Sequence, residues 1–438
     1  MSRWFGKPLE PGNFPAYDLL PWKKPMDRVP WWSWFGLAVI IISQLLLIPQ
    51  VEPIYTHFTL IVWWGLILFL DGLIRKRRGV SFLPDRPVLF LFLAIVSLFW
   101  WLVFEFYNCY LENWVYIGIP ENLYHRYICY GLSFATITPA ILLTYEFFLT
   151  YWPLQGKHAS SQPRKWTLWT WFLFGAVCVA LPLLIPQREI RHYLFGFVWV
   201  GFVFLLEPVL YWAGGYSLLR LWANGYKRLV WLMFAAGIVC GLLWEFWNFW
   251  AGAKWLYVVP LANLQGIPFY SEYGGMLRYF EMPLLGFLGF LPFAWECLVL
   301  SYFSALILNQ TNLLPHFQPP AEKTVWSARC LFIVLLLLFG LTYVIQDERY
   351  FPIRHLHFQT QTAQGRELKL PTTKIHQKKK SLISDLNRLP WEPALAQMDN
   401  FAILGLLQRS KSPAVREAAD DAIRAYAVQA RFNWANQQ

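Results

Sequence analysis

Charged residues are scarce in this chain of 438 residues: they make up 14% of it, whereas hydrophobic residues make up 57% and aromatic residues 19%. A soluble globular domain contains about 25% charged residues, so an ordinary soluble fold is excluded. Cysteine is scarce as well: the six cysteines form no C-x-x-C motif, and H-E-x-x-H is absent. We therefore expect neither a metal site nor a cofactor. Residues 1–30 contain six prolines and no apolar run, which argues against a cleaved signal peptide.

Long apolar stretches are the main feature of the sequence. About twenty residues cross a hydrocarbon core of about 30 Å, and nine stretches reach this length: 32–48, 55–74, 88–108, 131–151, 168–186, 193–212, 229–250, 281–305 and 327–345. With a cytoplasmic N-terminus, the inner segments hold seventeen Lys and Arg residues and the outer loops between the stretches hold five. This bias predicts a multi-pass protein of a bacterial-type inner membrane with an extracytoplasmic C-terminal region. It also explains much of the formal charge of +11 without a nucleic-acid partner.

A polar pattern occurs twice at the end of a tryptophan-rich stretch. The first copy has Glu105, Asn108, Trp114 and Tyr116, and the second has Glu245, Asn248, Trp255 and Tyr257. Other carboxylates match in the same order, namely Asp71 with Glu207 and Glu146 with Glu296. We interpret the match as an internal duplication into two parallel four-helix repeats, related by an axis along the membrane normal. Similar composition of tryptophan-rich membrane helices is the alternative explanation.

The predicted fold is therefore all-α, a polytopic bundle of about nine transmembrane helices with a small extramembrane region. Its expected parts are a cytoplasmic segment (1–31), repeat 1 (32–152), repeat 2 (166–308), a ninth helix (326–346), a linker (347–391) and a C-terminal helical hairpin (392–438). The turn from Lys411 to Pro413 in the hairpin resembles that of a HEAT-type repeat. A single such unit cannot bury both of its faces, so we expect it to contact a protein partner or the membrane domain.

Carboxylates inside membrane helices are costly and often functional. The sequence places Glu105, Asn108, Glu245, Asn248 and Glu281 near the outer helix ends, and a second, inner layer contains Asp71, Glu146, Glu207 and Glu296. We predict Glu245 as the proton carrier, Asn248 as the residue that positions it, and Glu281 as a charged group at a helix N-terminus. The expected substrate-binding residues are Trp244, Trp255, Tyr257, Arg278, Glu105 and Asn108. The structural alternative is that these groups only tie helices together.

The second copy resembles the membrane-embedded lycopene cyclase domains and related carotenoid-modifying proteins. The resemblance rests on Glu245, Trp255-x-Tyr257, Glu281-x-Pro283 and Trp295-Glu296. It implies proton-driven, redox-neutral cyclisation of an isoprenoid by acidic side chains. The chain departs from that family because its Pro-x-Glu-Glu motif is missing. The chain also looks like bacterial polytopic membrane proteins that carry W-E-F-W-N and F-E-M-P-L-L-G motifs.

Three functional classes follow from these features. The first is a cyclase- or isomerase-like membrane enzyme that binds a lipid or isoprenoid and acts on it by carboxylate acid–base chemistry. The alternatives are a non-catalytic membrane subunit that recruits a partner through its C-terminal helices, and a proton-coupled transporter in which the two carboxylate layers relay protons.

Overall fold

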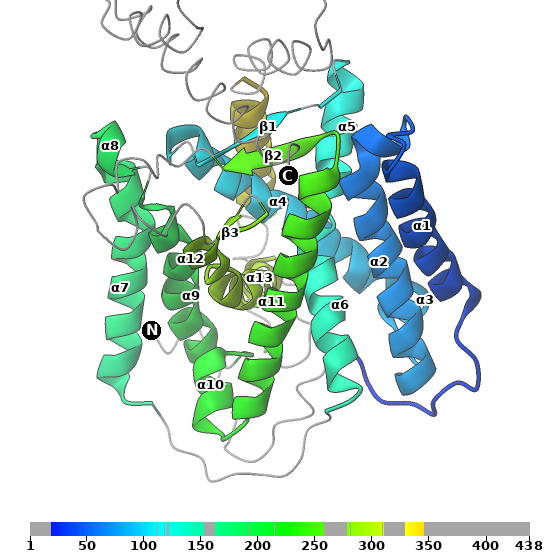
Figure 1. The fold of residues 1–438 in the computed structure, drawn as a ribbon. Coiled ribbons are helices and arrows are strands. Elements are labelled where there is room, and N and C mark those ends of the chain that lie inside the picture. The colour runs from blue at the N-terminus through cyan, green and yellow to red at the C-terminus, as the bar shows by residue number, and fades with distance from the viewer. Residues whose placement is uncertain are drawn as a thin grey trace, which may run out of the picture.

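The computed structural model describes residues 19–152, 163–257, 278–308, 310 and 329–345, except positions 112, 118, 121, 192, 214 and 281. This part of the chain is almost entirely helical (Figure 1). The predicted linker (347–391) and C-terminal hairpin (392–438) lie outside the described residues, as do residues 1–18 of the N-terminal segment. The elements are α1 (Trp31–Leu47), α2 (Ile54–Arg78), α3 (Phe82–Asp85), α4 (Pro87–Leu111), β1 (Trp114–Ile117), α5 (Leu123–Phe134), α6 (Ile137–Leu149), α7 (Lys165–Leu184), α8 (Arg188–Arg191), α9 (Phe195–Trp212), α10 (Leu218–Ala223), α11 (Lys227–Trp250), β2 (Lys254–Tyr257), β3 (Arg278–Tyr279), β4 (Met282–Pro283), α12 (Leu284–Phe287) and α13 (Phe290–Ile307).

Seven helical segments among the described residues are long and apolar enough to cross a membrane: α2, α4, α5 with α6, α7, α9, α11 and α13. Two further apolar helices, α1 and the helix Arg329–Ile345, are shorter than this threshold. The described part of the chain is therefore an almost entirely helical membrane protein, as the composition predicted. Each of the nine apolar stretches of the sequence overlaps one of these segments.

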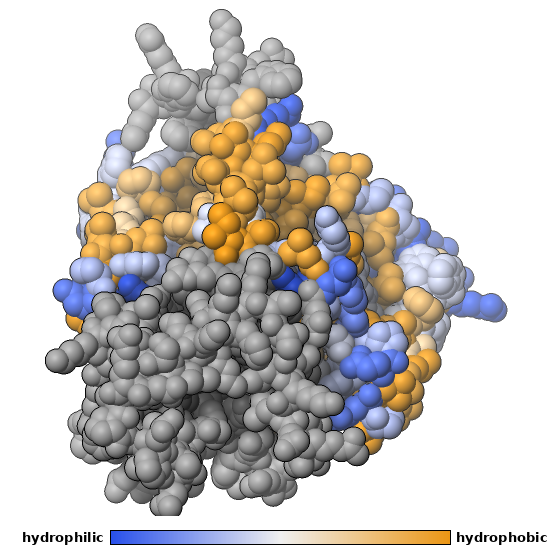
Figure 2. Space-filling model, turned by 90° about the horizontal axis from the view of Figure 1, so that it is seen from above, coloured by the Kyte–Doolittle hydropathy of each residue, from blue (hydrophilic) through white to orange (hydrophobic). Residues whose placement is uncertain are grey.

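Hydrophobic side chains cover the outside of the bundle as well as its core. Large apolar residues are exposed along α1, α7 and the helix Arg329–Ile345, including Ile41, Leu45, Leu173, Val177, Leu337 and Leu341. Figure 2 shows hydrophobic residues over much of the described part of one face. A soluble protein rarely exposes such large apolar patches. Contact with lipid tails accounts for this surface.

Close helix pairs form where glycine lies at the contact. A Cβ atom on Gly36 of α1 would lie 2.5 Å from the carbonyl oxygen of Gly65 on α2, and one on Gly175 of α7 would lie 2.1 Å from the backbone nitrogen of Leu205 on α9. Small residues let helix backbones approach this closely in membranes. The pairs α1–α2 and α7–α9 are thus built in the same way.

A short two-stranded ribbon covers one end of the bundle (Figure 1). It consists of β1, which follows α4, and β2, which follows α11. The strands are antiparallel, and Trp114 lies opposite Tyr257 while Tyr116 lies opposite Trp255. Because strand side chains alternate between faces, these four aromatic residues share one face of the ribbon.

Candidate functional site

Asn108 and Asn248 attach the ribbon to the helices beneath it. The Asn248 side-chain oxygen accepts a hydrogen bond from the backbone N–H of Trp255 at 3.0 Å, and its Nδ2 donates to the Trp255 carbonyl at 2.8 Å. Asn108 makes the same pair of contacts with the backbone of Trp114, at 3.1 and 3.0 Å. Each asparagine therefore hydrogen-bonds both backbone groups of a strand residue that follows its helix. Both were predicted as site residues, and in the structure they organise the ribbon.

Glu105 is surrounded by hydrogen-bond donors. Its Oε1 accepts from the Tyr116 hydroxyl at 2.5 Å and from the indole N–H groups of Trp101 and Trp114, both at 3.0 Å. The Glu105 side chain is almost completely buried. Burial, reinforced by the neighbouring Glu105 carboxyl, raises the pKa of Tyr116 well above its ordinary value. Tyr116 therefore remains protonated and donates to Glu105.

Glu245 occupies the matching position on α11. The Tyr257 hydroxyl donates to its Oε1 at 2.8 Å, and the Trp255 indole donates in turn to the Tyr257 hydroxyl at 3.1 Å. Glu245 is fully buried. The ribbon thus carries one tyrosine to each of the two outer glutamates.

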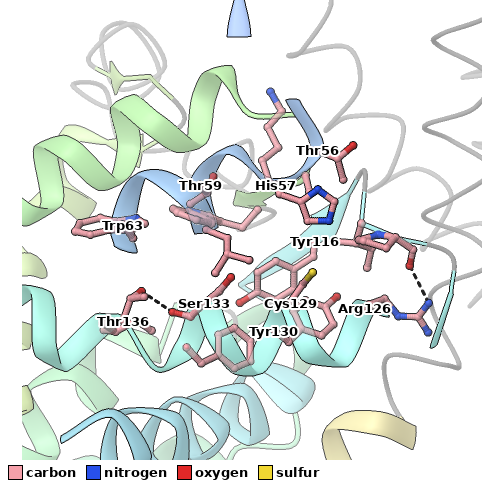
Figure 3. A pocket seen from close by; sticks show the side chains of 18 of the residues that line it. Thr56, His57, Thr59, Trp63, Tyr116, Arg126, Cys129, Tyr130, Ser133 and Thr136 are labelled. Atoms are coloured by element: carbon pink, nitrogen blue, oxygen red, sulfur yellow. Dashed lines mark hydrogen bonds between the residues drawn. The ribbon is translucent and has the colours of Figure 1, made fainter. Parts of the chain in front are cut away.

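A pocket lies under the ribbon, between α2 and α5 (Figure 3). Its empty space, including its open side, is about 810 Å³. Trp101, Trp244 and Trp255 contribute aromatic walls from α4, α11 and β2. Side chains of both proposed repeats therefore meet in one cavity.

The pocket also has basic side chains in its lining. In Figure 3, His57 and Arg126 lie toward one end, whereas Trp63 lies at the other. Arg126 donates to the Pro120 carbonyl at 3.1 Å, and Lys254 also lines the pocket. No acidic residue is among the described side chains of the lining. The described lining is therefore apolar, and its charged side chains are basic.

The structure brings together only some of the predicted site residues. Trp244 and Trp255 line the pocket, but Glu245, Asn248 and Tyr257 do not. The pocket reaches the first copy instead, where Tyr116 connects it to Glu105. Glu281 lies outside the described residues; for Arg278 the structure describes the backbone, which pairs with Pro283 in the small β3–β4 sheet.

Asp71, from the predicted inner layer, caps a helix. Its Oδ1 accepts from the backbone N–H groups of Phe82 and Leu83 at 2.9 and 3.1 Å, and its Oδ2 accepts from the Ser81 hydroxyl at 2.9 Å. These donors form the first turn of α3, whose N–H groups have no partner within the helix. Asp71 therefore holds α3 against α2.

Glu207 has the same role in the second copy. Its carboxylate accepts from the backbone N–H groups of Leu218 and Leu219, at 2.7 and 3.3 Å, in the first turn of α10. An anionic side chain is favourable at a helix N-terminus. Asp71 and Glu207 therefore have matching structural roles as helix caps.

Glu146 and Glu296 also match in the sequence but have different surroundings. Glu146 accepts from Arg78 at 2.6 Å and from the backbone N–H of Leu19 at 2.8 Å. Glu296 on α13 is fully buried, and neither of its oxygens has a hydrogen-bond partner within the part of the chain that the structure describes. Glu146 thus joins α2, α6 and the N-terminal segment, while Glu296 makes no comparable connection there.

Three residues of a candidate metal site, two of which line the pocket, escaped prediction. His57 on α2 and His125 and Cys129 on α5 have their side-chain donor atoms within 4.8 Å of one another. The spacing of His125 and Cys129 places them on one helix face and was a usable signal. His57 lies 68 residues earlier, so its proximity depends on the packing of α2 against α5. A search for paired C-x-x-C or H-E-x-x-H spacing does not find such a cluster.

Comparisons of the chain with protein-family models, with curated proteins and with solved structures give no match.

Proposed function

We propose that this membrane protein binds a lipid or isoprenoid with an acidic headgroup in the pocket under the ribbon. The observation that carries the proposal is the lining: tryptophan and aliphatic walls, two cationic side chains, and no acidic residue among the described ones. Apolar walls suit a hydrocarbon or polyene chain, because ligand sites are mostly apolar with a few placed polar groups. Arg126 and Lys254 suit an anionic head.

Retention of geranylgeranoic acid and of its methyl ester, measured by mass spectrometry after dialysis of the detergent-purified protein, tests this binding. We expect the acid to be retained in preference to the ester. A Ser133→Phe substitution places a ring in the pocket and should abolish retention of both. Thr170→Phe, on an exposed position of α7, is the matched control. Retention unaffected by Ser133→Phe would disprove the pocket, and equal retention of acid and ester would disprove the acidic headgroup.

We further propose that acid–base chemistry on the bound molecule uses Tyr116 and Glu105. Tyr116 lines the pocket, and its hydroxyl is 2.5 Å from the Glu105 carboxylate, so a proton can pass between the substrate and Glu105 through the phenol. Glu245, the acid predicted from the sequence, lies behind Tyr257 and outside the lining. In this proposal Glu245 and Asn248 support the ribbon.

Chromatography of the lipids that co-purify with the protein tests the chemistry separately from the binding. The wild-type protein should carry substrate and product, whereas Tyr116→Phe should carry substrate alone. Tyr257→Phe, which removes the equivalent hydroxyl outside the pocket, is the control and should behave like the wild type. Identical lipid profiles for Tyr116→Phe and wild type would leave binding intact and disprove proton transfer by Tyr116.

The duplication into two parallel repeats belongs to the same proposal, with nine spans when α1 and the helix Arg329–Ile345 are included. The ribbon supports it, because its register is self-matching: Trp114 faces Tyr257 and Tyr116 faces Trp255. A twofold axis perpendicular to the ribbon relates the two strands, because it exchanges Trp114 with Trp255 and Tyr116 with Tyr257. The matching side-chain contacts of Asn108 and Asn248, and of Asp71 and Glu207, agree with the same axis.

We propose a cytoplasmic location for the end of the bundle opposite the ribbon. The last turn of α2 contains Arg75, Lys76, Arg77 and Arg78, and α11 begins with Lys227 and Arg228. Both helix ends lie away from the ribbon in Figure 1. The positive-inside bias then supports a bacterial-type inner membrane with the ribbon and the pocket on the outer side.

A further inference from the structure

The cluster of His57, His125 and Cys129 has the donor chemistry of a transition-metal site. The Nε2 atoms of the two histidines are 2.8 Å apart, and the Cys129 sulfur is within 4.8 Å of both. The two rings are nearly parallel, with an interplanar angle of 17°. Figure 3 shows His57 and Cys129 approaching each other from opposite helices. We propose that these three side chains bind one Zn²⁺ ion at the edge of the pocket.

The tautomer of His57 favours a metal. Its Nδ1 lies 2.8 Å from the carbonyl oxygen of Pro53. A carbonyl only accepts hydrogen bonds, so Nδ1 carries the proton and donates. In the neutral ring the lone pair is then on Nε2, which faces His125. Metal-bound histidines are usually oriented in this way, by donating the second ring N–H to a carbonyl or carboxylate.

The helical spacing supplies the other two donors. His125 and Cys129 are four residues apart on α5, so their side chains project from one face. Asn122 caps this helix by accepting from the backbone N–H of His125 at 3.0 Å, which fixes the start of α5. Two donors thus come from one turn of α5 and the third from the neighbouring helix α2.

The geometry requires only a small adjustment to hold zinc. Zn²⁺ binds imidazole nitrogen at about 2.0–2.1 Å and thiolate sulfur at about 2.3 Å in a tetrahedral arrangement, which separates ligand atoms by about 3.3–3.6 Å. The two Nε2 atoms must move slightly apart and the sulfur inward, each by roughly 1 Å or less.

Three protein donors leave one tetrahedral position open, as in zinc sites that hold water or substrate. His57 and Cys129 both line the pocket, so the open position adjoins that cavity. One thiolate and two neutral imidazoles offset a single charge of Zn²⁺. A bound ion would therefore add positive charge at the edge of the pocket, and its fourth position would be available to water. Metal binding by the three donors does not require a lipid in the pocket.

Metal content and Co²⁺ absorption of the full-length protein test the site. The protein is purified in detergent with any affinity tag removed, stripped with a chelator and dialysed against Zn²⁺ or Co²⁺. We expect one Zn²⁺ per chain, and a Co²⁺ spectrum with tetrahedral d–d bands and a thiolate charge-transfer band. His57→Ala, His125→Ala and Cys129→Ser should each weaken binding roughly tenfold or more, and Cys129→Ser should remove the charge-transfer band. Cys109→Ser, which removes another partly buried cysteine, should bind like the wild type.

Alkylation of the wild-type protein gives a second readout that does not depend on variants folding. Zn²⁺ should protect Cys129 from iodoacetamide and leave the labelling of Cys109 unchanged, as measured by peptide mass spectrometry. Less than half an equivalent of Zn²⁺ per chain, equal labelling of Cys129 with and without Zn²⁺, or binding of Cu⁺ but not Zn²⁺ would overturn the proposal.

Discussion

Arg78 and Glu146 form an ion pair in which neither side chain has any exposed surface. One guanidinium nitrogen of Arg78 donates to Glu146 Oε2 at 2.6 Å and also to the Leu20 carbonyl at 3.0 Å. The pair connects the C-terminal end of α2 to α6 and to the segment before α1. Because each charge is buried, each depends on the other for its stability.

Arg78→Met should destabilise the protein strongly, because it leaves Glu146 buried without its cation. Breaking one side of a buried pair costs about 3–5 kcal/mol. The double variant Arg78→Met/Glu146→Leu should recover much of this loss, since it removes both charges. Thermal unfolding in detergent, followed by intrinsic fluorescence, measures the difference. If the double variant is no more stable than Arg78→Met, the two side chains are not coupled as the structure indicates.

Glu296→Gln should raise the free energy of unfolding, whereas Glu146→Gln should lower it. Glu296 has no hydrogen-bond partner within the described part of the chain, so a neutral amide removes the cost of burying an acidic group. We expect unfolding to require about 1–2 kcal/mol more free energy. The same change at Glu146 deprives Arg78 of its anion and should lower stability. A loss of stability in Glu296→Gln would show that this carboxyl has a stabilising partner.

The ribbon should loosen when either asparagine is removed. Asn108→Ala and Asn248→Ala each leave backbone groups of Trp114 or Trp255 without a partner, at a cost of about 1–3 kcal/mol. The double variant should cost less than the sum, because both residues hold the same ribbon. Hydrogen exchange of the amides in β1 and β2 is the readout. Fully additive costs would indicate that the two strands are anchored independently.

The glycine contacts predict a steric effect that a matched control can isolate. Gly175→Ala places a Cβ 2.1 Å from the backbone of Leu205, so α7 and α9 must separate, at a cost of about 1–3 kcal/mol. Gly196→Ala, on α9 with no atom within 4 Å of the added carbon, should be neutral or stabilising. Thermal unfolding of the two variants in detergent measures the difference. Equal stability of the two variants would contradict the close packing of α7 on α9.

Much of the architecture could be predicted from the sequence because membrane spans are a local property. Each apolar run carries its own signal, and all nine overlap helical segments among the described residues. The repeated Glu, Asn and Trp-x-Tyr spacing likewise predicted that two similar units would bear buried glutamates. Their local contacts, such as Asn248 with Trp255, follow from separations of a few residues.

The candidate site was harder to predict because its members are far apart in the chain. The pocket combines α2, α5 and both strands of the ribbon, and the sequence pointed to Glu245 rather than to the cavity beside Tyr116. Asp71 and Glu207 were expected in a functional layer, but short helices that follow them in the chain use their carboxylates as caps. Sequence spacing shows that polar residues recur, but it does not show which donors will surround them.

The sequence by itself determined that this is a helical membrane protein with a recurring polar motif, since hydropathy and spacing act within one segment at a time. Only the tertiary structure decided that Tyr116 and Trp255 lie opposite each other, that a charged pocket opens beneath them, and that His57 meets His125 and Cys129. These relationships depend on how helices pack, and packing is set by side-chain shape across contacts between distant parts of the chain.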